Sequence, residues 1–293
     1  MNKLSKESFD EIRLWIYRNA RPLDLALWKY HFENGSKEDV LLVLSFYQNE
    51  DGGFGNSIEP SAWKKESTPY NVWFAIRILK MIEFYDMTHP IYQGIFRYLE
   101  NTEYKADFGW HFITPGGNWD GREHENHYQS IGITAILSGL ILRYQDKQST
   151  IYNMAVQYTK MLIGKLSTNQ FGDMGIQGYC KLIEDLEAAE VAEAFDYPYL
   201  CEKMKDIVWN KIHDKTNDFF MENPLMFVFS PRSRFYEDNR KEVEAELDQI
   251  TNELPSKGVW ELPWKESSEV SANWWKSFEA IDKLVQLKQF NRI

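Results

Sequence analysis

The sequence predicts an all-α protein, an α/α toroid of about six helix pairs that spans residues 1–293 as one domain. Three observations carry this prediction. Stretches with the apolar spacing of helices follow one another, amphipathic stretches alternate with stretches that are apolar on nearly all faces, and glycine or aromatic loops separate them. The apolar stretches recur at roughly 45–60 residues, a period typical of helical-pair repeats. A closed ring would bury these inner helices on all sides.

Helical patterns account for most of the chain, and β signals are scarce. A weak strand pattern covers 225–230, and glycine or aromatic loops are expected at 103–126, 169–178 and 255–268. The helices are expected at 5–19, 22–32, 37–47, 69–79, 90–100, 127–144, 150–166, 179–195, 198–213, 237–254 and 270–287. No linker rich in Pro, Gly or Ser divides the chain, which favours a single domain.

The stretch 48–79 shows one complete helix–turn–helix unit. Ser36 is the expected cap of the helix before it, whose apolar face would consist of Leu41, Leu42, Leu44 and Phe46. Asp51-Gly52-Gly53 ends that helix because glycine adopts backbone angles that other residues resist. Phe54 would bury its ring under the turn, and Thr68-Pro69 starts a largely apolar helix in the order of a cap followed by proline.

Composition limits the classes of partner and of location. The net charge of −11 argues against nucleic acid or an anionic membrane surface as the main partner. No apolar window approaches a membrane span, and the first residues lack the apolar core of a signal peptide, so a cytoplasmic protein is expected. The two cysteines, Cys180 and Cys201, make neither a disulfide framework nor a zinc motif. Eleven tryptophans suggest that some line a cavity.

The motif Gln48-Asn49-Glu50-Asp51-Gly52-Gly53-Phe54-Gly55 resembles the repeat of squalene and terpenoid cyclases and of protein prenyltransferase β-subunits. Weaker echoes lie at 108–110, 171–173 and 258–260, and the stretches 20–24 and 31–33 resemble a bacterial group that carries this repeat. The resemblance implies an α/α toroid. It does not carry over a reaction, because the Asp-x-Asp-Asp acid of the cyclases is absent and Cys180 has no Asp two residues before it, as the zinc site of the prenyltransferases would require.

The candidate catalytic residues lie on loops that lead into inner helices, which a ring of helix pairs would gather at one mouth. They are Glu59, Asp120, His124, Glu125 and His127, and we expect Glu59, Asp120, His124 and His127 to approach one another. Imidazole and carboxylate groups suit general acid–base chemistry. No cofactor is expected. A divalent metal ion in the loop 110–127 is a less favoured alternative, since His-Glu-Asn-His lacks metalloprotease spacing, and a solvated loop without chemistry is another.

Three functions stay open at this stage. The first is binding of, or chemistry on, an isoprenoid-like apolar small molecule in the central cavity, as the resemblance implies. The second is a carbohydrate hydrolase or lyase with paired loop carboxylates, for which Trp63, Trp110, Trp119, Trp260 and Trp264 would be sugar-binding platforms. The third is a scaffold without catalysis. The inner-helix aromatics Trp73, Phe74, Trp274, Trp275 and Phe278 fit a core better than a wall that stabilises a carbocation.

Overall fold

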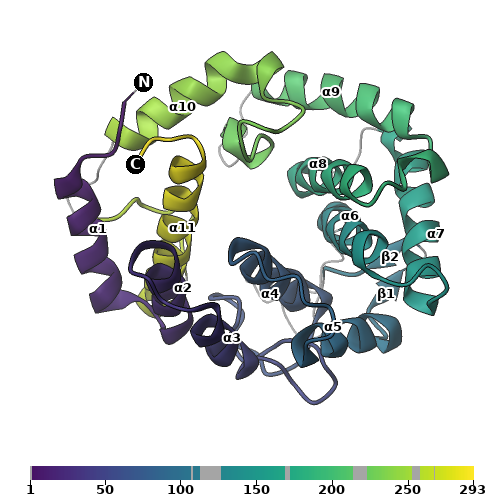
Figure 1. The fold of residues 1–293 in the computed structure, drawn as a ribbon, viewed down its shortest axis with the longest axis horizontal. Coiled ribbons are helices and arrows are strands. Elements are labelled where there is room, and N and C mark those ends of the chain that lie inside the picture. The colour runs from purple at the N-terminus through teal and green to yellow at the C-terminus, as the bar shows by residue number, and fades with distance from the viewer. Residues whose placement is uncertain are drawn as a thin grey trace. The chain divides into compact units, whose positions relative to one another are not determined.

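The computed structural model describes residues 2–106, 108–112, 127–168, 172–213, 223–252, 258–266 and 268–293. Within them the chain forms eleven α-helices, four short 3-10 helices and one antiparallel ribbon of two strands (Figure 1). The predicted all-α class is therefore confirmed. The elements are α1 (Lys6–Asn19), α2 (Pro22–Phe32), α3 (Lys37–Ser45), α4 (Pro69–Met81), α5 (Pro90–Asn101), β1 (Lys105–Ala106), β2 (Gly109–Trp110), α6 (His127–Tyr144), α7 (Thr150–Lys165), α8 (Gly172–Ala188), α9 (Tyr197–His213), α10 (Arg240–Asn252) and α11 (Glu269–Gln289).

The chain divides into two compact units. Unit 1 comprises Met1–Phe46 and Trp209–Ile293, and unit 2 comprises Tyr47–Val208. Unit 1 is discontinuous in sequence, so the first and last helices of the chain belong to the same unit. Each unit has its own buried helices. The single domain over residues 1–293 and the closed ring of helix pairs stay predictions.

Helix starts follow the local chemistry that the sequence indicates. Ser36 Oγ accepts the backbone N–H of Asp39 at 3.0 Å, while the Asp39 carboxylate accepts the N–H of Ser36, which completes a capping box for α3. Thr68 Oγ1 accepts the N–H of Asn71 at 3.0 Å, and Pro69 is the first residue of α4. Both predicted helix starts are confirmed.

The glycine turn of 48–54 is tied to α5 within unit 2. Gln48 Nε2 donates to the carbonyl groups of Gly52 and Ile91, both at 2.9 Å. Gly52 has a φ of 91°, and a Cβ at this position would lie 2.2 Å from the Gly94 carbonyl oxygen. Only glycine therefore allows the turn and α5 to approach this closely. Phe54 is fully buried, as the sequence predicts.

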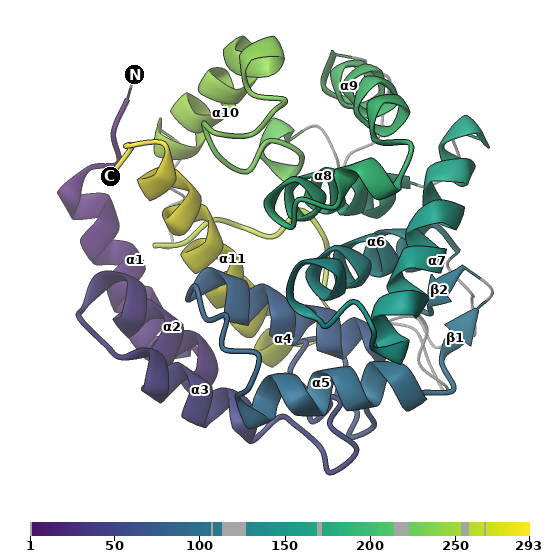
Figure 2. The same cartoon turned by 45° about the vertical axis from the view of Figure 1, so that its right-hand side comes forward.

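Glycines also set the distance between α6 and α8, which lie side by side in Figures 1 and 2. A Cβ on Gly132 of α6 would lie 2.2 Å from the Met174 carbonyl oxygen, and a Cβ on Gly178 of α8 would lie 2.5 Å from the Gly132 carbonyl oxygen. The two backbones are therefore in direct contact. The helix expected at 179–195 is confirmed over 179–188, but its bounds are wrong, since α8 begins at Gly172, within the expected loop, and ends at Ala188. These glycines serve helix packing and not a turn.

One buried carboxylate joins three helices of unit 2. Asp185 of α8 is 3% exposed, and its oxygens accept from Lys80 Nζ of α4 at 2.9 Å and from Arg143 Nη1 of α6 at 3.1 Å. Lys80 and Arg143 lie in the last turns of their helices, where a positive charge also complements the helix dipole. We call this group the Asp185 hub.

Three further expectations need correction. The helix expected at 37–47 ends at Ser45, and Leu42 and Phe46 are not part of a buried face, with exposures of 60% and 72%. The weak strand at 225–230 is instead a 3-10 helix over Pro224–Met226. Part of the expected loop 103–126 forms the ribbon of β1 and β2, in which Trp110 N–H donates to Thr134 Oγ1 of α6 at 2.9 Å.

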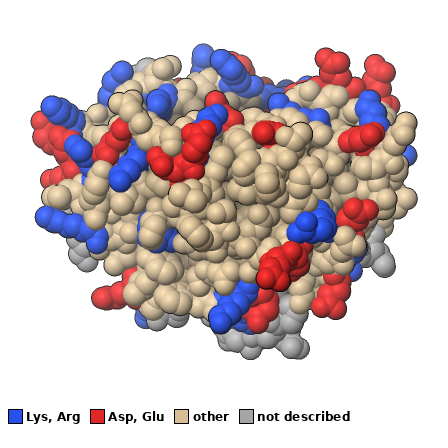
Figure 3. All heavy atoms as spheres, turned by 60° about the horizontal axis from the view of Figure 1, so that its bottom comes forward, with Lys and Arg blue, Asp and Glu red and all other residues tan. Residues whose placement is uncertain are grey.

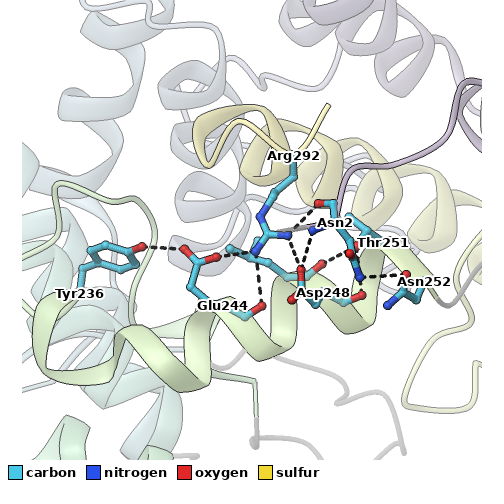
Figure 4. Close-up of polar contacts among 8 residues, drawn as sticks. Asn2, Tyr236, Glu244, Asp248, Thr251, Asn252 and Arg292 are labelled. Carbon is cyan, nitrogen blue, oxygen red and sulfur yellow. Dashed lines mark hydrogen bonds and ion pairs between the residues drawn. The ribbon is translucent and has the colours of Figure 1, made fainter.

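The two ends of the chain meet in unit 1 around one arginine (Figure 4). Arg292 is fully buried, forms ion pairs with Glu244 and Asp248 of α10, and donates from Nη1 to the Asn2 carbonyl at 2.7 Å. Asn2 N–H in turn donates to the Asp248 carboxylate at 2.9 Å. This arginine therefore links both chain ends to α10.

Acidic and basic side chains are interspersed on the face drawn in Figure 3, around a broad area of uncharged residues. The excess of acidic residues in the sequence is thus not gathered into one continuous patch among the coloured residues of that face.

Candidate functional site

Unit 2 contains an aromatic cluster where α4 begins. Tyr70 and Trp73 are three residues apart on α4 and stack with ring centres 5.4 Å apart. Phe112 follows β2, and its ring centre lies 4.5 Å from that of Tyr70. Its backbone N–H donates to Ser130 Oγ of α6 at 2.9 Å, which fixes its position. The rings of Tyr70, Trp73 and Phe112, which we call the α4 aromatic cluster, are largely buried.

A buried amide lies in the same turn of α4. Asn71 is 1% exposed, and no hydrogen-bond donor reaches its side-chain Oδ1. Leaving such an acceptor without a hydrogen bond costs about 1–3 kcal/mol in a protein interior. The first turn of α4 therefore combines apolar ring faces with one polar acceptor that a bound molecule could satisfy.

The predicted carboxylate Glu59 lies in the loop before α4 and is fully buried. Its Oε2 accepts the backbone N–H of Ala62 at 2.6 Å. Asn56 and Ser57, at the start of this loop, have φ values of 56° and 63°, which are unfavourable for residues other than glycine. A buried carboxyl group and backbone strain in one short loop are typical of functional sites.

Two predicted platforms of unit 2 differ in their surroundings. Trp63 is 57% exposed, and its indole N–H donates to the Pro60 carbonyl at 3.0 Å. Trp110 is fully buried and donates to the Leu99 carbonyl at 2.9 Å, with its ring edge-on to Tyr158. It presents no face to a ligand, so we leave Trp110 out of the proposed site.

The other two described platforms belong to unit 1. Trp260 is largely buried, and its indole N–H donates to the Ile250 carbonyl at 3.3 Å. Trp264 is half-buried, donates to Glu266 at 2.6 Å and meets Trp275 of α11 edge-on. Their role in sugar binding stays a prediction.

Unit 1 also contains a buried ion pair at the start of α2. Arg21 Nε donates to Asp24 Oδ2 at 2.9 Å, and the side chains are 1% and 0% exposed. Burial raises the pKa of Asp24 to about 6, although the positive charge of Arg21 opposes the change. The guanidinium of Arg21 lies 5.8 Å from the ring centre of Trp274 on α11.

The remaining predicted site residues cannot be placed. Trp119, Asp120, His124 and Glu125 lie outside the described residues, and His127 is described only as the first residue of α6, without its side chain. The expected approach of Glu59 to Asp120, His124 and His127 therefore stays a prediction. In the part of the chain that the structure describes, no three His, Cys, Asp or Glu side chains are grouped to hold a metal ion.

Sequence reasoning missed Tyr70, Asn71, Phe112 and Asp24 as site residues. The pattern Thr68-Pro69 does place Tyr70 and Asn71 in a first helical turn, but nothing local shows that Phe112 will lie against Tyr70. The signal for Asp24 is its spacing of three residues from Arg21 across a helix start.

No family model, curated protein or solved structure matches this chain. Among the described helices, none has the length and apolar character needed to cross a membrane.

Proposed function

We propose that this chain is an α/α toroid that binds an isoprenoid-like apolar small molecule at the α4 aromatic cluster. The observation that carries the proposal is the combination of three ring faces, Tyr70, Trp73 and Phe112, with the unsatisfied Oδ1 of Asn71 in the same helical turn. Aromatic walls with one oriented polar group are typical of sites for apolar ligands. Because Asn71 Oδ1 is an acceptor, the ligand is expected to carry a hydroxyl group that donates a hydrogen bond to it.

The support for this site is local and physical. Tyr70 and Trp73 stack with an angle of 16° between their ring planes, and together they would form an apolar wall for the hydrocarbon part of a ligand. The hydroxyl of an isoprenoid alcohol would remove the cost of the buried Asn71 acceptor, about 1–3 kcal/mol. Glu59 lies in the loop that precedes this turn and would add a carboxylate if the protein also transforms its ligand.

A titration with farnesol, followed by tryptophan fluorescence and native mass spectrometry, tests the proposal. We expect Trp73→Leu to weaken binding by roughly threefold to tenfold, the contribution of one aromatic contact. Asn71→Leu should weaken farnesol about fivefold and leave the hydrocarbon farnesene unchanged, because only the alcohol donates a hydrogen bond. Trp209→Leu, at an exposed tryptophan of unit 1, is the matched control and should not change the affinity. Farnesol binding that Trp73→Leu leaves intact would reject this site.

A further inference from the structure

The ribbon of β1 and β2 has two edges within unit 2, and α6 adjoins one of them. Along an antiparallel strand, alternate N–H groups point to opposite sides. His111 N–H donates to the Tyr104 carbonyl at 3.0 Å, on the β1 side. The N–H groups of Trp110 and Phe112 point the other way, to α6. No third strand pairs with this edge among the described residues, so its backbone groups need other partners.

Two hydroxyl groups of α6 take the place of a third strand. Trp110 N–H donates to Thr134 Oγ1 at 2.9 Å, and the Thr134 hydroxyl donates in return to the Trp110 carbonyl at 3.3 Å. Phe112 N–H donates to Ser130 Oγ at 2.9 Å. The spacings match, because two residues of a strand rise about 6.7 Å and four residues of a helix about 6 Å. Both hydroxyls are buried, and we call Ser130 and Thr134 the α6 hydroxyl pair.

A glycine selects the register of β2 on this pair. Gly109 has a φ of 148°, and a Cβ at this position would lie 2.1 Å from Thr134 Oγ1 and from Thr134 Cγ2. A slip by two residues toward Ser138, the next buried hydroxyl along α6, would bring His111 to the place of Gly109. The Cβ of His111 would then strike Thr134. Gly109 therefore favours the register in which Phe112 lies beside Ser130.

We infer that the α6 hydroxyl pair positions Phe112 in the α4 aromatic cluster. Phe112 is the one ring of this cluster that does not come from α4, and its ring centre lies 4.5 Å from that of Tyr70. Its backbone is held to Ser130 directly and to Thr134 through β2. Ser130 and Thr134 are thus positioning residues that act on the cluster through Phe112. Their effect on a ligand rests on the proposed function, whereas their effect on the contact between Phe112 and Tyr70 does not.

Fluorine NMR of the full chain measures this contact without a ligand. Para-fluorophenylalanine at position 112 reports the ring current of Tyr70, and Tyr70→Leu gives the resonance of a lost contact. Ser130→Ala and Thr134→Val each remove one hydroxyl group and should move the resonance toward that value. Thr134→Ser keeps the hydroxyl and should restore the wild-type position. The matched control is Ser138→Ala, because Ser138 Oγ is buried on the same helix without a hydrogen-bond partner, and its loss should leave the resonance unchanged.

Farnesol binding gives a second and separate readout. Ser130→Ala should weaken it by roughly threefold to tenfold, the contribution of one aromatic contact, and Ser138→Ala should not change it. If farnesol does not bind the wild-type chain, the proposed function fails. The fluorine resonances still decide whether the α6 hydroxyl pair positions Phe112, so the two proposals fail separately.

Three outcomes would overturn the inference. One is an unchanged resonance in Ser130→Ala and Thr134→Val when Tyr70→Leu displaces it. Another is a displacement in Ser138→Ala as large as theirs, which would show that the loss of any hydroxyl loosens α6. The third is an unchanged resonance in Tyr70→Leu, which would mean that the two rings do not meet. Circular dichroism checks that each variant folds, and Ser130→Ala, which removes a single oxygen atom, decides the result if Thr134→Val does not fold.

Discussion

Helix α2 carries two titratable groups, the buried Asp24 and the half-buried His31, whose effects on stability oppose each other over the same pH range. Burial raises the pKa of Asp24 from 3.8 to about 6, so its contribution to stability is complete below pH 4 and is lost as pH rises through 6. Burial, and secondarily the charge of Lys288, lowers the pKa of His31 from 6.5 to about 4, while Asp282 opposes the change. Its contribution is complete above pH 6.5 and is lost as pH falls through 4.

The two magnitudes nearly cancel. One pKa unit corresponds to about 1.4 kcal/mol. Asp24 therefore removes about 3 kcal/mol between pH 4 and pH 7, and His31 adds about 3 kcal/mol over the same interval. Relative to the wild type, we expect the free energy of unfolding of Asp24→Asn to rise by about 3 kcal/mol across this interval. That of His31→Gln should fall by a similar amount.

Urea unfolding at pH 4, 5, 6 and 7, followed by circular dichroism and tryptophan fluorescence, measures these slopes. Other carboxyl groups of unit 1 with lowered pKa values, such as Glu33 and Asp248, add a rising slope that is common to all variants and cancels in the differences. Asp24→Asn also shifts the stability by an amount that does not depend on pH, because an amide replaces the carboxyl group that Arg21 contacts, so the slope and not the absolute value is diagnostic. Profiles of both variants that run parallel to the wild type within about 0.5 kcal/mol would refute the assignment of these groups.

Three further predictions concern unit 2, each measured by urea unfolding. Gly178→Ala should destabilise the protein by about 1–3 kcal/mol because the new Cβ would strike the backbone of α6. The control Gly164→Ala should stabilise it by about 0.5–1 kcal/mol, because no atom lies within 4 Å of a Cβ at that position. Changes of the same sign in both variants would contradict this packing. Gln48→Leu should cost about 2 kcal/mol through two lost hydrogen bonds, and Gln93→Leu, at an exposed glutamine with one such bond, clearly less; equal losses would count against the tie to α5. Asp185→Asn should lower the free energy of unfolding by roughly 3 kcal/mol, and by the same amount in 1 M salt, because the carboxylate is buried. A clearly smaller loss in 1 M salt would show that solvent screens these ion pairs and would contradict a buried hub.

The parts of the fold that the sequence predicts well are those that depend on neighbours in the chain. Ser36 and Thr68 cap helices because their hydroxyl groups reach N–H groups three residues later, which needs no tertiary information. The turn at Gly52 is likewise visible in the sequence, since Asp-Gly-Gly after an apolar helix has few other solutions. The contact from Gln48 to α5 is not local, and the sequence does not predict it.

Glycines that serve packing cannot be told from glycines that serve turns by local pattern. Gly172 and Gly178 both suggested a loop. Gly172 has a φ of 53° at the start of α8, whereas Gly178 contacts the backbone of α6. Leu42 and Phe46 illustrate the opposite error, because helical spacing places apolar residues on one face but does not say whether anything covers that face.

The candidate site shows the same limit. Trp73 was visible as an inner-helix aromatic, but its significance depends on Tyr70 stacking on it and on Phe112, which comes from another element. Trp110 was expected as a platform because of its loop position, and the hydrogen bond to Leu99 places it in the core instead. Residue type and spacing therefore suggest which side chains carry chemistry, whereas tertiary contacts decide which of them meet.

The two ends of α4 have different tasks within unit 2. Lys80 in its last turn joins the Asp185 hub, which also holds α6 and α8, whereas Tyr70 in its first turn belongs to the aromatic cluster. At a rise of 1.5 Å per residue, these positions are about 15 Å apart along the helix. The ion pairs of the hub therefore cannot touch a ligand at the cluster, but they fix the three helices against one another. The polar groups that hold the bundle are kept away from the apolar surface that would bind, so substitutions in the hub should change stability and leave the ligand preference unchanged.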